Sequence, residues 1–255
     1  MFLHGNGAMV EDFQASGLPD KLKDARLIAF DRPGFGHSTR PRSKVWTPSA
    51  QADLIQKALA RLGVTEAIVI GHSWGALVAA TLAVRHPSHV KGLVLASGYY
   101  FPSARLDGVM SAGGAMPGVG DLMSHTVSPL LGRMIWGAML RKIFGPAEVP
   151  EKFDIFPKEM ALRPSQLRAA AVEATIMVPA AAAAYQHYGE LKMPVAIIAG
   201  MDDRLIDFRA QSKRLHDVIP QSTLRGVPGC GHMVHQTATN DVLAAIEEVR
   251  TKTSR

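Results

Sequence analysis

The stretch Gly71-His72-Ser73-Trp74-Gly75 decides how this chain folds. The apolar run Ala67–Ile70 precedes it, and the small, apolar residues Ala76–Leu82 follow it. This order predicts a strand, a sharp turn and a helix, with Ser73 at the apex of the turn. The two glycines let strand and helix approach closely, so the serine hydroxyl stands free at the carboxyl edge of a sheet. A chance G-x-S-x-G between a core strand and a core helix is the alternative that these five residues leave open.

Strand and helix patterns alternate on either side of this turn. Short apolar strands are predicted over residues 1–3, 26–30, 67–70, 90–96, 194–199 and 222–227. Helical patterns cover residues 10–23, 47–62, 76–86, 208–218 and 239–250. This alternation predicts an α/β protein, in which a mostly parallel sheet is flanked by helices and joined by right-handed crossovers.

Residues 99–190 interrupt the alternation, because they contain no convincing strand. Helical patterns lie instead around residues 122–144, 150–162 and 164–188. We therefore expect an α/β core of residues 1–98 and 191–255, with residues 99–190 inserted as a helical cap, or lid.

The composition of this cap bears on its ligand. It holds seven of the twelve methionines, namely Met110, Met116, Met123, Met134, Met139, Met160 and Met177. Flexible, apolar methionines suit an adaptable lid over an apolar ligand, or simply the cap's own small core. The eight acidic and eight basic residues of the cap balance, so nothing argues for a strongly charged substrate.

Charge and cysteine content exclude several other classes of protein. The net charge of +6 is spread along the chain, with a mild cluster between Lys21 and Lys44, and we interpret it as a solubility feature rather than a nucleic-acid tail. The single cysteine, Cys230, excludes an internal disulfide. The uncharged run Ala67–Val84 fits a buried strand and helix better than a membrane span. No signal peptide is visible at Met1, so we expect a cytoplasmic protein.

Three chemically useful groups lie just beyond the ends of three different strands: Ser73, the Asp202/Asp203 pair and His232. In an open parallel sheet these ends meet at the edge where ligands bind. The chain order of serine, acid and histidine is the one expected for a serine at such a turn. A serine hydroxyl is a poor nucleophile until an imidazole takes its proton, and a carboxylate must hold that imidazole in the right tautomer. The set therefore predicts nucleophilic catalysis.

Together these pieces resemble a capped α/β hydrolase of the serine esterase and lipase type. The matching motifs are His4-Gly5-Asn6-Gly7, Asp31–Ser38, Gly71–Gly75, Gly200–Asp203 and Gly229–His232. They span nearly the whole chain in the family's order and spacing. They are specific for the fold and the triad, and only weakly specific for the substrate.

The resemblance implies a role for each catalytic candidate. Ser73 is the nucleophile and His232 is its base. The family places its acid three residues after a glycine, so Gly200 favours Asp203, with Asp202 as the alternative. No metal and no organic cofactor is implied.

The oxyanion hole implied by the resemblance consists of the backbone N–H groups of Asn6 and Trp74. In haloalkane dehalogenases of this fold, an equivalent Asn and Trp hold the departing halide beside an aspartate nucleophile. Ser73 cannot form the same alkyl ester, so acyl transfer to serine and then to water fits better. We expect the turn-rich segment Asp31–Ser38 to be structural, and His235 to lie at a helix entry or on the pocket rim.

Three functions follow as hypotheses. The first is a carboxylesterase that cleaves small-to-medium apolar esters through an acyl-enzyme intermediate. The second keeps the triad but changes the reaction to C–C bond hydrolysis, amide cleavage or cofactor-free perhydrolysis. The third is a ligand-binding protein without turnover. We expect a small-molecule ester as the partner, no nucleic acid, no membrane span, and a monomer or homodimer.

The chain departs from the family at its start. Family members carry several strands before the His-Gly loop, whereas only Met1, Phe2 and Leu3 precede His4 here. We therefore expect that N-terminal strands are missing, and that the missing segment could carry a signal or an anchor.

Overall fold

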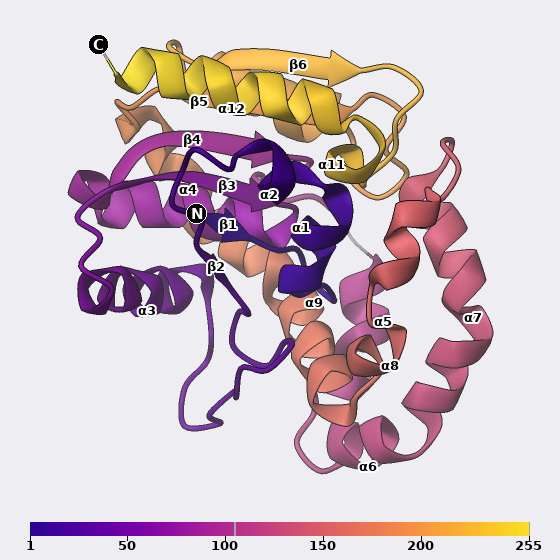
Figure 1. Cartoon of the computed structure of the whole chain (residues 1–255). Helices are drawn as coiled ribbons and strands as arrows, with labels where there is room; N and C mark the ends of the chain where they lie inside the picture. The colour runs from indigo at the N-terminus through magenta and orange to yellow at the C-terminus, as the bar shows by residue number, and fades with distance from the viewer. Residues whose placement is uncertain (105, 255) are drawn as a thin grey trace.

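The computed structural model describes residues 1–104 and 106–254. At its centre lies a six-stranded parallel sheet in the order β2-β1-β3-β4-β5-β6 (Figure 1). The strands are β1 (Phe2–Leu3), β2 (Ala29–Phe30), β3 (Ala67–His72), β4 (Val90–Ala96), β5 (Val195–Gly200) and β6 (Thr223–Val227). The predicted α/β fold with a parallel sheet is confirmed.

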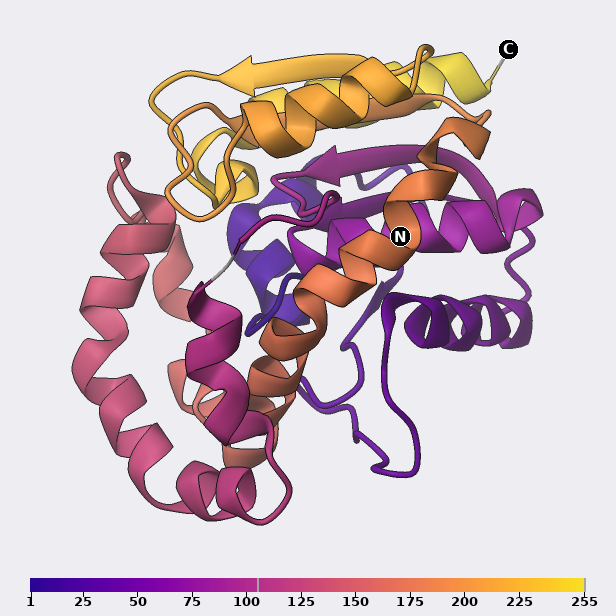
Figure 2. The ribbon, with the colours of Figure 1, turned by 180° about the vertical axis from the view of Figure 1, so that it is seen from behind.

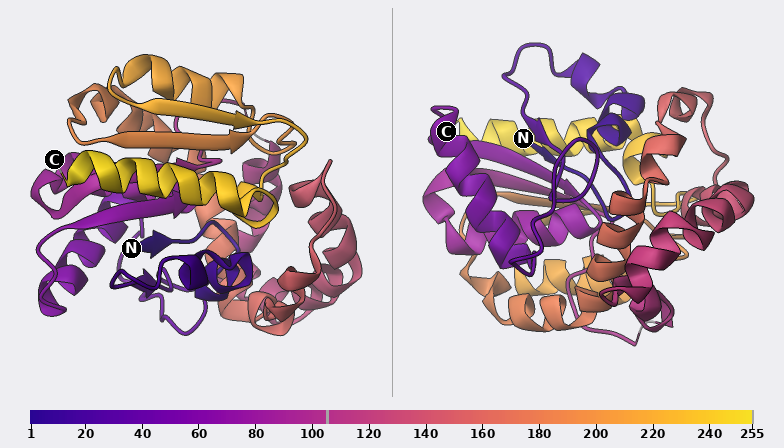
Figure 3. Two further views of the ribbon diagram at one scale, coloured as in Figure 1. Left: turned by 45° about the horizontal axis from the view of Figure 1, so that its top comes forward. Right: turned by 90° about the horizontal axis from the view of Figure 1, so that it is seen from below.

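Helices cover both faces of this sheet (Figure 3). One face packs against α3 (Pro48–Arg61), α4 (Trp74–Arg85), the π-helical turn η4 (Arg209–Lys213) and α10 (Arg214–Val218). The other face packs against α1 (Val10–Ser16), α2 (Leu18–Lys21), α11 (Val234–Thr237) and α12 (Thr239–Thr253). A short 3₁₀ turn, η1 (Pro87–His89), connects α4 to β4.

The alternation of side chains along β4 shows how this arrangement buries the strands. Leu93 and Leu95 join the core beneath α4, while Val94 and Ala96 join the core beneath α12. Because both faces are covered, the central strands are continuous apolar runs rather than alternating ones.

The segment between β4 and β5 forms the helical cap, which lies beyond the carboxyl ends of the strands (Figures 1 and 2). Its elements are α5 (Leu106–Ala115), α6 (Val119–His125), α7 (Val127–Phe144), η2 (Glu151–Ile155), α8 (Lys158–Ala161), α9 (Pro164–Ala184) and η3 (Tyr185–Glu190).

The helix boundaries differ from the predicted ones where the backbone leaves the helical region. The helix predicted over residues 122–144 is two helices, because Thr126 adopts φ −123° and ψ −84° between α6 and α7. The helix predicted over residues 10–23 ends early, because Gly17 adopts φ 74° between α1 and α2. Helix α5 has no counterpart among the predicted elements.

The cap methionines have several different environments. Met139 and Met177 line a cavity above Ser73, and Met160 packs against a small hydrophobic cluster shared by cap and core. Met116, Met123 and Met134 are exposed, and the side chain of Met110 lies outside the described residues. Some of the cap methionines therefore line the cavity and one fills a small core, but neither role explains all seven.

The run Pro164–Glu190, which comprises α9 and η3, is long and apolar enough to cross a membrane by length and composition. The helical pattern predicted over residues 164–188 is confirmed, although only Ala67–Val84 stands out in the sequence as a run of membrane-spanning length. Here it joins the cap to the core, because Glu173 pairs with the buried Arg32 and because Met177 and Ala181 belong to the main hydrophobic core.

Candidate active site

Ser73 lies at the sharp turn between β3 and α4, at the carboxyl edge of the sheet. Its φ of 55° is unusual for a residue with a Cβ, and the close packing around it holds this conformation. A Cβ on Gly75 would lie 2.1 Å from the carbonyl oxygen of Leu3, and one on Gly71 would lie 2.5 Å from that of Gly75. Glycine at both positions therefore lets helix, turn and strand approach closely enough to present the hydroxyl.

A hydrogen-bonded relay connects Ser73 to a histidine and an aspartate. The Nε2 atom of His232 lies 3.0 Å from Ser73 Oγ, and its Nδ1 atom lies 2.7 Å from Asp203 Oδ2. The other carboxylate oxygen, Asp203 Oδ1, accepts hydrogen bonds from the backbone N–H groups of Leu205 and Ile206. These bonds hold the carboxylate in place against the imidazole.

Asp202, the alternative acid, points elsewhere. Its Oδ2 atom accepts a hydrogen bond from Gly229 N at 2.8 Å, and the residue is exposed. Its carboxylate therefore ties the loop after β5 to the loop after β6 and does not contact His232.

The backbone of His232 is also held on both sides. Its N–H donates to the carbonyl of Ile143 in α7, and its carbonyl lies 3.1 Å from Nε2 of His72. A cap helix and the residue before Ser73 thus position the loop that carries the imidazole.

The two candidate oxyanion donors flank Ser73. Among the described residues, neither Asn6 N–H nor Trp74 N–H donates to any acceptor. The Asn6 side-chain amide donates instead to the carbonyl of Ala170 in α9. The Trp74 indole is fully buried in the main core and does not line the cavity, so the halide-binding arrangement of a dehalogenase is not formed by this side chain.

A buried arginine supports the loop that carries Asn6. Arg32 donates from Nε to the carbonyl of His4 and from Nη2 to the carbonyl of Gly5, both at 2.8 Å. Its Nη1 atom pairs with Glu173 of α9 at 2.5 Å, and both side chains are almost fully buried. The segment that contains Arg32 is the structural turn predicted for residues 31–38, and Asp31 adds to it by accepting from the N–H of His37.

Glu173 is absent from the site residues predicted from the sequence. It is the only Asp, Glu, Lys or Arg between Arg168 and Glu190. A single carboxylate in an otherwise apolar helix could have indicated a buried ion pair, because a buried charge needs a partner.

Of the two places predicted for His235, the helix entry is confirmed and the pocket rim is not, because this residue is fully buried in the first turn of α11. Its Nε2 atom lies 3.0 Å from Asp12 Oδ1. Burial raises the pKa of the Asp12 carboxyl, but the imidazoles of His235 and His72 outweigh burial and lower this pKa to about 2. Burial lowers the pKa of His72 well below its usual range, so this imidazole stays neutral at pH 7.

Asp12, His72 and His235 also form a group with the spacing of metal ligands, with ligand atoms within 4.8 Å of one another. The contact between Asp12 and His235 accounts for two of these residues, whereas His72 Nδ1 has no hydrogen-bond partner among the described residues.

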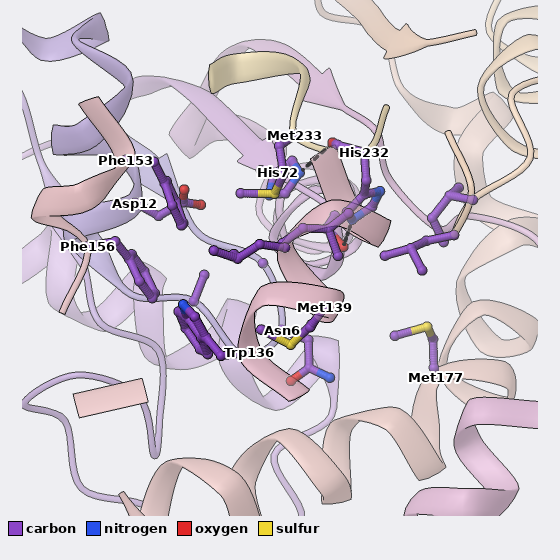
Figure 4. Close-up of a pocket in the computed structure, with 18 residues that line it drawn as sticks. Asn6, Asp12, His72, Trp136, Met139, Phe153, Phe156, Met177, His232 and Met233 are labelled. Carbon is purple, nitrogen blue, oxygen red and sulfur yellow. Dashed lines mark hydrogen bonds between the residues drawn. The ribbon is translucent and has the colours of Figure 1, made fainter. Parts of the chain in front are cut away.

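A cavity of about 210 Å³ lies above Ser73 and His232 (Figure 4). Phe153, Phe156 and Trp136 form an aromatic wall, and Met177 lies on the opposite side (Figure 4). The remaining apolar side chains of the lining are Ala8, Met139, Leu140, Ile143, Leu205, Ile206 and Met233. No lysine or arginine is among the described residues that line this cavity.

A parallel sheet, a strained serine at a strand–helix turn and a helical cap over the strand ends define the class of α/β hydrolases. The chain belongs to this family, because the family model described as alpha/beta hydrolase fold matches residues 1–239.

Curated relatives include 2-hydroxymuconate semialdehyde hydrolases. The one from Pseudomonas putida is 27% identical over 247 residues, which cover 91% of this chain and 79% of that protein. The one from Pseudomonas sp. strain CF600 is 36% identical over 106 residues, which cover 40% of this chain and only 38% of that protein.

Similar solved structures include two esterases. The thermophilic esterase from Thermogutta terrifontis superposes with a TM-score of 0.77 at 20% identity, covering 99% of this chain and 89% of that one. Esterase RhEst1 from Rhodococcus sp. ECU1013 gives a TM-score of 0.70 at 26% identity, covering 98% and 90%. This chain is therefore a hydrolase of the α/β fold.

Proposed function

We propose that this hydrolase cleaves uncharged carboxylic esters of small to medium size through an acyl-enzyme on Ser73. The observation that carries the proposal is the Asp203–His232–Ser73 relay, with its 2.7 Å and 3.0 Å contacts, beneath an apolar cavity. Similarity to esterase RhEst1 supports the same reaction.

In the first half-reaction, Ser73 Oγ attacks the ester carbonyl carbon while His232 Nε2 takes its proton. Asp203 holds the opposite ring nitrogen and stabilises the imidazolium that forms. The carbonyl oxygen becomes an oxyanion, which accepts from the free N–H groups of Asn6 and Trp74. The intermediate collapses when His232 returns the proton to the leaving alkoxide, so an alcohol departs and an acyl-serine remains.

In the second half-reaction, water takes the place of the alcohol. His232 removes a proton from the water, which attacks the acyl carbon, and then protonates Ser73 Oγ as the carboxylic acid leaves. The same two N–H groups hold the second oxyanion.

The cavity supports an uncharged, apolar substrate. Its wall of Trp136, Phe153 and Phe156 favours an apolar acyl or alkoxy group. The carboxylate in its lining belongs to Asp12, which disfavours a substrate that carries its own carboxylate there.

C–C bond hydrolysis is the second candidate function, because a 2-hydroxymuconate semialdehyde hydrolase aligns with 91% of this chain. A muconate-type substrate is a carboxylate, and the absence of lysine and arginine from the described cavity lining leaves it without a cationic partner. We therefore rank this function below ester hydrolysis.

A substrate panel tests the proposal. p-Nitrophenyl acetate, butyrate and octanoate are compared with a 2-hydroxy-6-oxo-dienoate, using the wild type and Ser73→Ala. We expect turnover of the shorter esters, and a loss of about four to six orders of magnitude in kcat in the variant. Ester turnover that survives in Ser73→Ala would refute the mechanism. Efficient dienoate cleavage with little ester turnover would select the second candidate.

A further inference from the structure

A second cavity, of about 270 Å³, lies where a core loop meets the first turns of α9. It shares no described lining residue with the cavity above Ser73. Four of its lining residues are cationic and most of the others are apolar; the full set is Arg40, Pro41, Arg42, Lys44, Val45, Trp46, Ser165, Arg168, Ala169 and Val172. Arg40, Arg42 and Lys44 belong to the basic cluster between Lys21 and Lys44. Part of that cluster therefore lines a cavity, in addition to any effect on solubility.

The carboxylates near this cavity do not balance its cations. Arg42 and Arg168 share one carboxylate, that of Asp121, at 2.6 Å and 3.1 Å. Arg40 lies 3.8 Å from Glu173, which already pairs with Arg32. Lys44 lies over the ring of Trp46 and has no carboxylate partner among the residues that the structure describes. The cavity therefore carries a local excess of positive charge.

Two guanidinium nitrogens at this cavity lack a hydrogen-bond acceptor. Arg40 Nη2 and Arg168 Nη1 are both buried, and neither has a partner among the described residues. An unsatisfied buried donor costs free energy, most of all when it carries charge. Burial lowers the pKa of Arg40, and repulsion by Arg32 and Arg168 lowers it further against the opposing effect of Glu173. An anion in the cavity would relieve the repulsion among Arg32, Arg40 and Arg168.

The walls of the cavity are fixed by contacts that need no ligand. Arg40 Nη1 donates to the carbonyl of Pro33 at 2.7 Å, which holds the guanidinium against its own loop. Gly34 lies so close to α9 that a Cβ there would come within 2.7 Å of Ala169 Cβ. The cavity is thus formed in advance, with a cationic side and an apolar side contributed by Trp46 and Val172.

We propose that this second cavity binds a small organic anion, namely a carboxylate or phosphate carried on an apolar or aromatic body. The oxyanion accepts hydrogen bonds from Arg40 and Arg168, and the body packs against Trp46 and Val172. Because Arg40 belongs to a core loop and Arg168 to a cap helix, the bound anion stabilises the contact between cap and core. The proposal does not depend on the reaction at Ser73.

Thermal unfolding and calorimetric titration test this site. Phenyl phosphate and benzoate are the probes, and they distinguish the two oxyanions. Benzyl alcohol is the neutral analogue, and inorganic phosphate lacks the apolar body. We expect one organic anion to raise Tm by about 5 °C at a hundredfold excess over its Kd. We expect no rise with benzyl alcohol and a smaller one with inorganic phosphate.

Variants locate the binding. Arg168→Gln and Arg40→Gln are expected to weaken binding at least about tenfold, since each removes a charged hydrogen-bond donor. Lys44→Gln, on the exposed rim, gives a milder loss and serves if a buried variant fails to fold. Arg133→Gln is the matched control, because this cap arginine pairs with Glu159 on the surface. Equal affinity of all four variants for the anion would overturn the proposal, because the anion would then bind elsewhere, for example in the cavity above Ser73. An equal rise of Tm with benzyl alcohol would overturn it as well.

Discussion

Two adjacent aspartates take different roles because the loop after β5 points them in different directions. The Asp203 carboxylate lies 2.7 Å from His232 Nδ1, and its side chain is almost fully buried. Asp202 is exposed and bonds to Gly229 N. Sequence spacing favours Asp203, and the geometry gives the reason, since only one carboxylate of an adjacent pair can face a given imidazole.

Asp203→Asn is therefore expected to lower kcat by about 10⁴-fold, because an amide donates to Nδ1 and leaves the imidazole in the wrong tautomer. Asp202→Asn retains an acceptor for Gly229 N and should keep kcat close to that of the wild type. Steady-state kinetics with p-nitrophenyl butyrate, with circular dichroism as the folding control, measures both. Equal losses in the two variants would contradict the assignment.

The pair of Asp12 and His235 predicts a pH dependence of stability. The pKa of Asp12 is about 2 in the folded protein and near 3.9 in the unfolded chain, so folding favours the carboxylate. The pair then contributes about 2 kcal/mol above pH 4, and this contribution is lost as the pH falls from 4 toward 2. Urea unfolding of wild type and Asp12→Asn across this range should show a shallower pH dependence in the variant. Parallel curves would refute this.

At the scale of elements, α9 connects the cap to the loop that carries the oxyanion donor. Arg32 holds the carbonyls of His4 and Gly5 and pairs with Glu173 in the middle of α9. Asn6 adds a second connection through the carbonyl of Ala170. Helix α9 thus supports this loop and, through Met177, also contributes to the cavity lining.

Replacing Glu173 with glutamine leaves the Arg32 charge buried and uncompensated. We expect the free energy of unfolding to fall by about 3–5 kcal/mol, and the loss of loop support to lower kcat as well. Glu159→Gln is the matched control, because its pair with Arg133 is largely exposed and should contribute less than about 1 kcal/mol. Denaturant unfolding compares the two variants, and a similar loss in both would exclude the proposed anchoring role.

At the scale of the whole molecule, α7 is apolar on two sides. Trp136 and Ile143 face the cavity, whereas Leu130 and Met134 are 63% and 83% exposed. Figure 1 shows α7 at the outer edge of the cap. Exposed apolar surface of this kind promotes association.

The double variant Leu130→Gln/Met134→Gln is expected to stay monodisperse at higher concentration than the wild type, with unchanged kcat/KM on soluble esters. Light scattering across a concentration series measures the first quantity. Ile155→Gln serves as the control, because this residue is also exposed but lies outside α7. Association that is unaffected by the double variant would show that this face is not responsible.

The sequence by itself determined the α/β fold, the position of the cap and the order of Ser73, Asp203 and His232. These features are local, because apolar runs specify strands, and glycines around a serine specify the sharp turn. The break at Thr126 escaped prediction, since both flanking stretches favour helix and only the packing of α6 and α7 separates them.

Only the tertiary structure decided the partners of the buried charges. Arg32 and Glu173 are 141 residues apart in the chain, and Asp12 and His235 come from opposite ends of it. The second cavity likewise needs both the loop around Arg40 and the helix that carries Arg168. A buried charge is stable only beside a partner, which follows from side-chain chemistry alone. Which residue becomes that partner depends on how elements far apart in the sequence pack together.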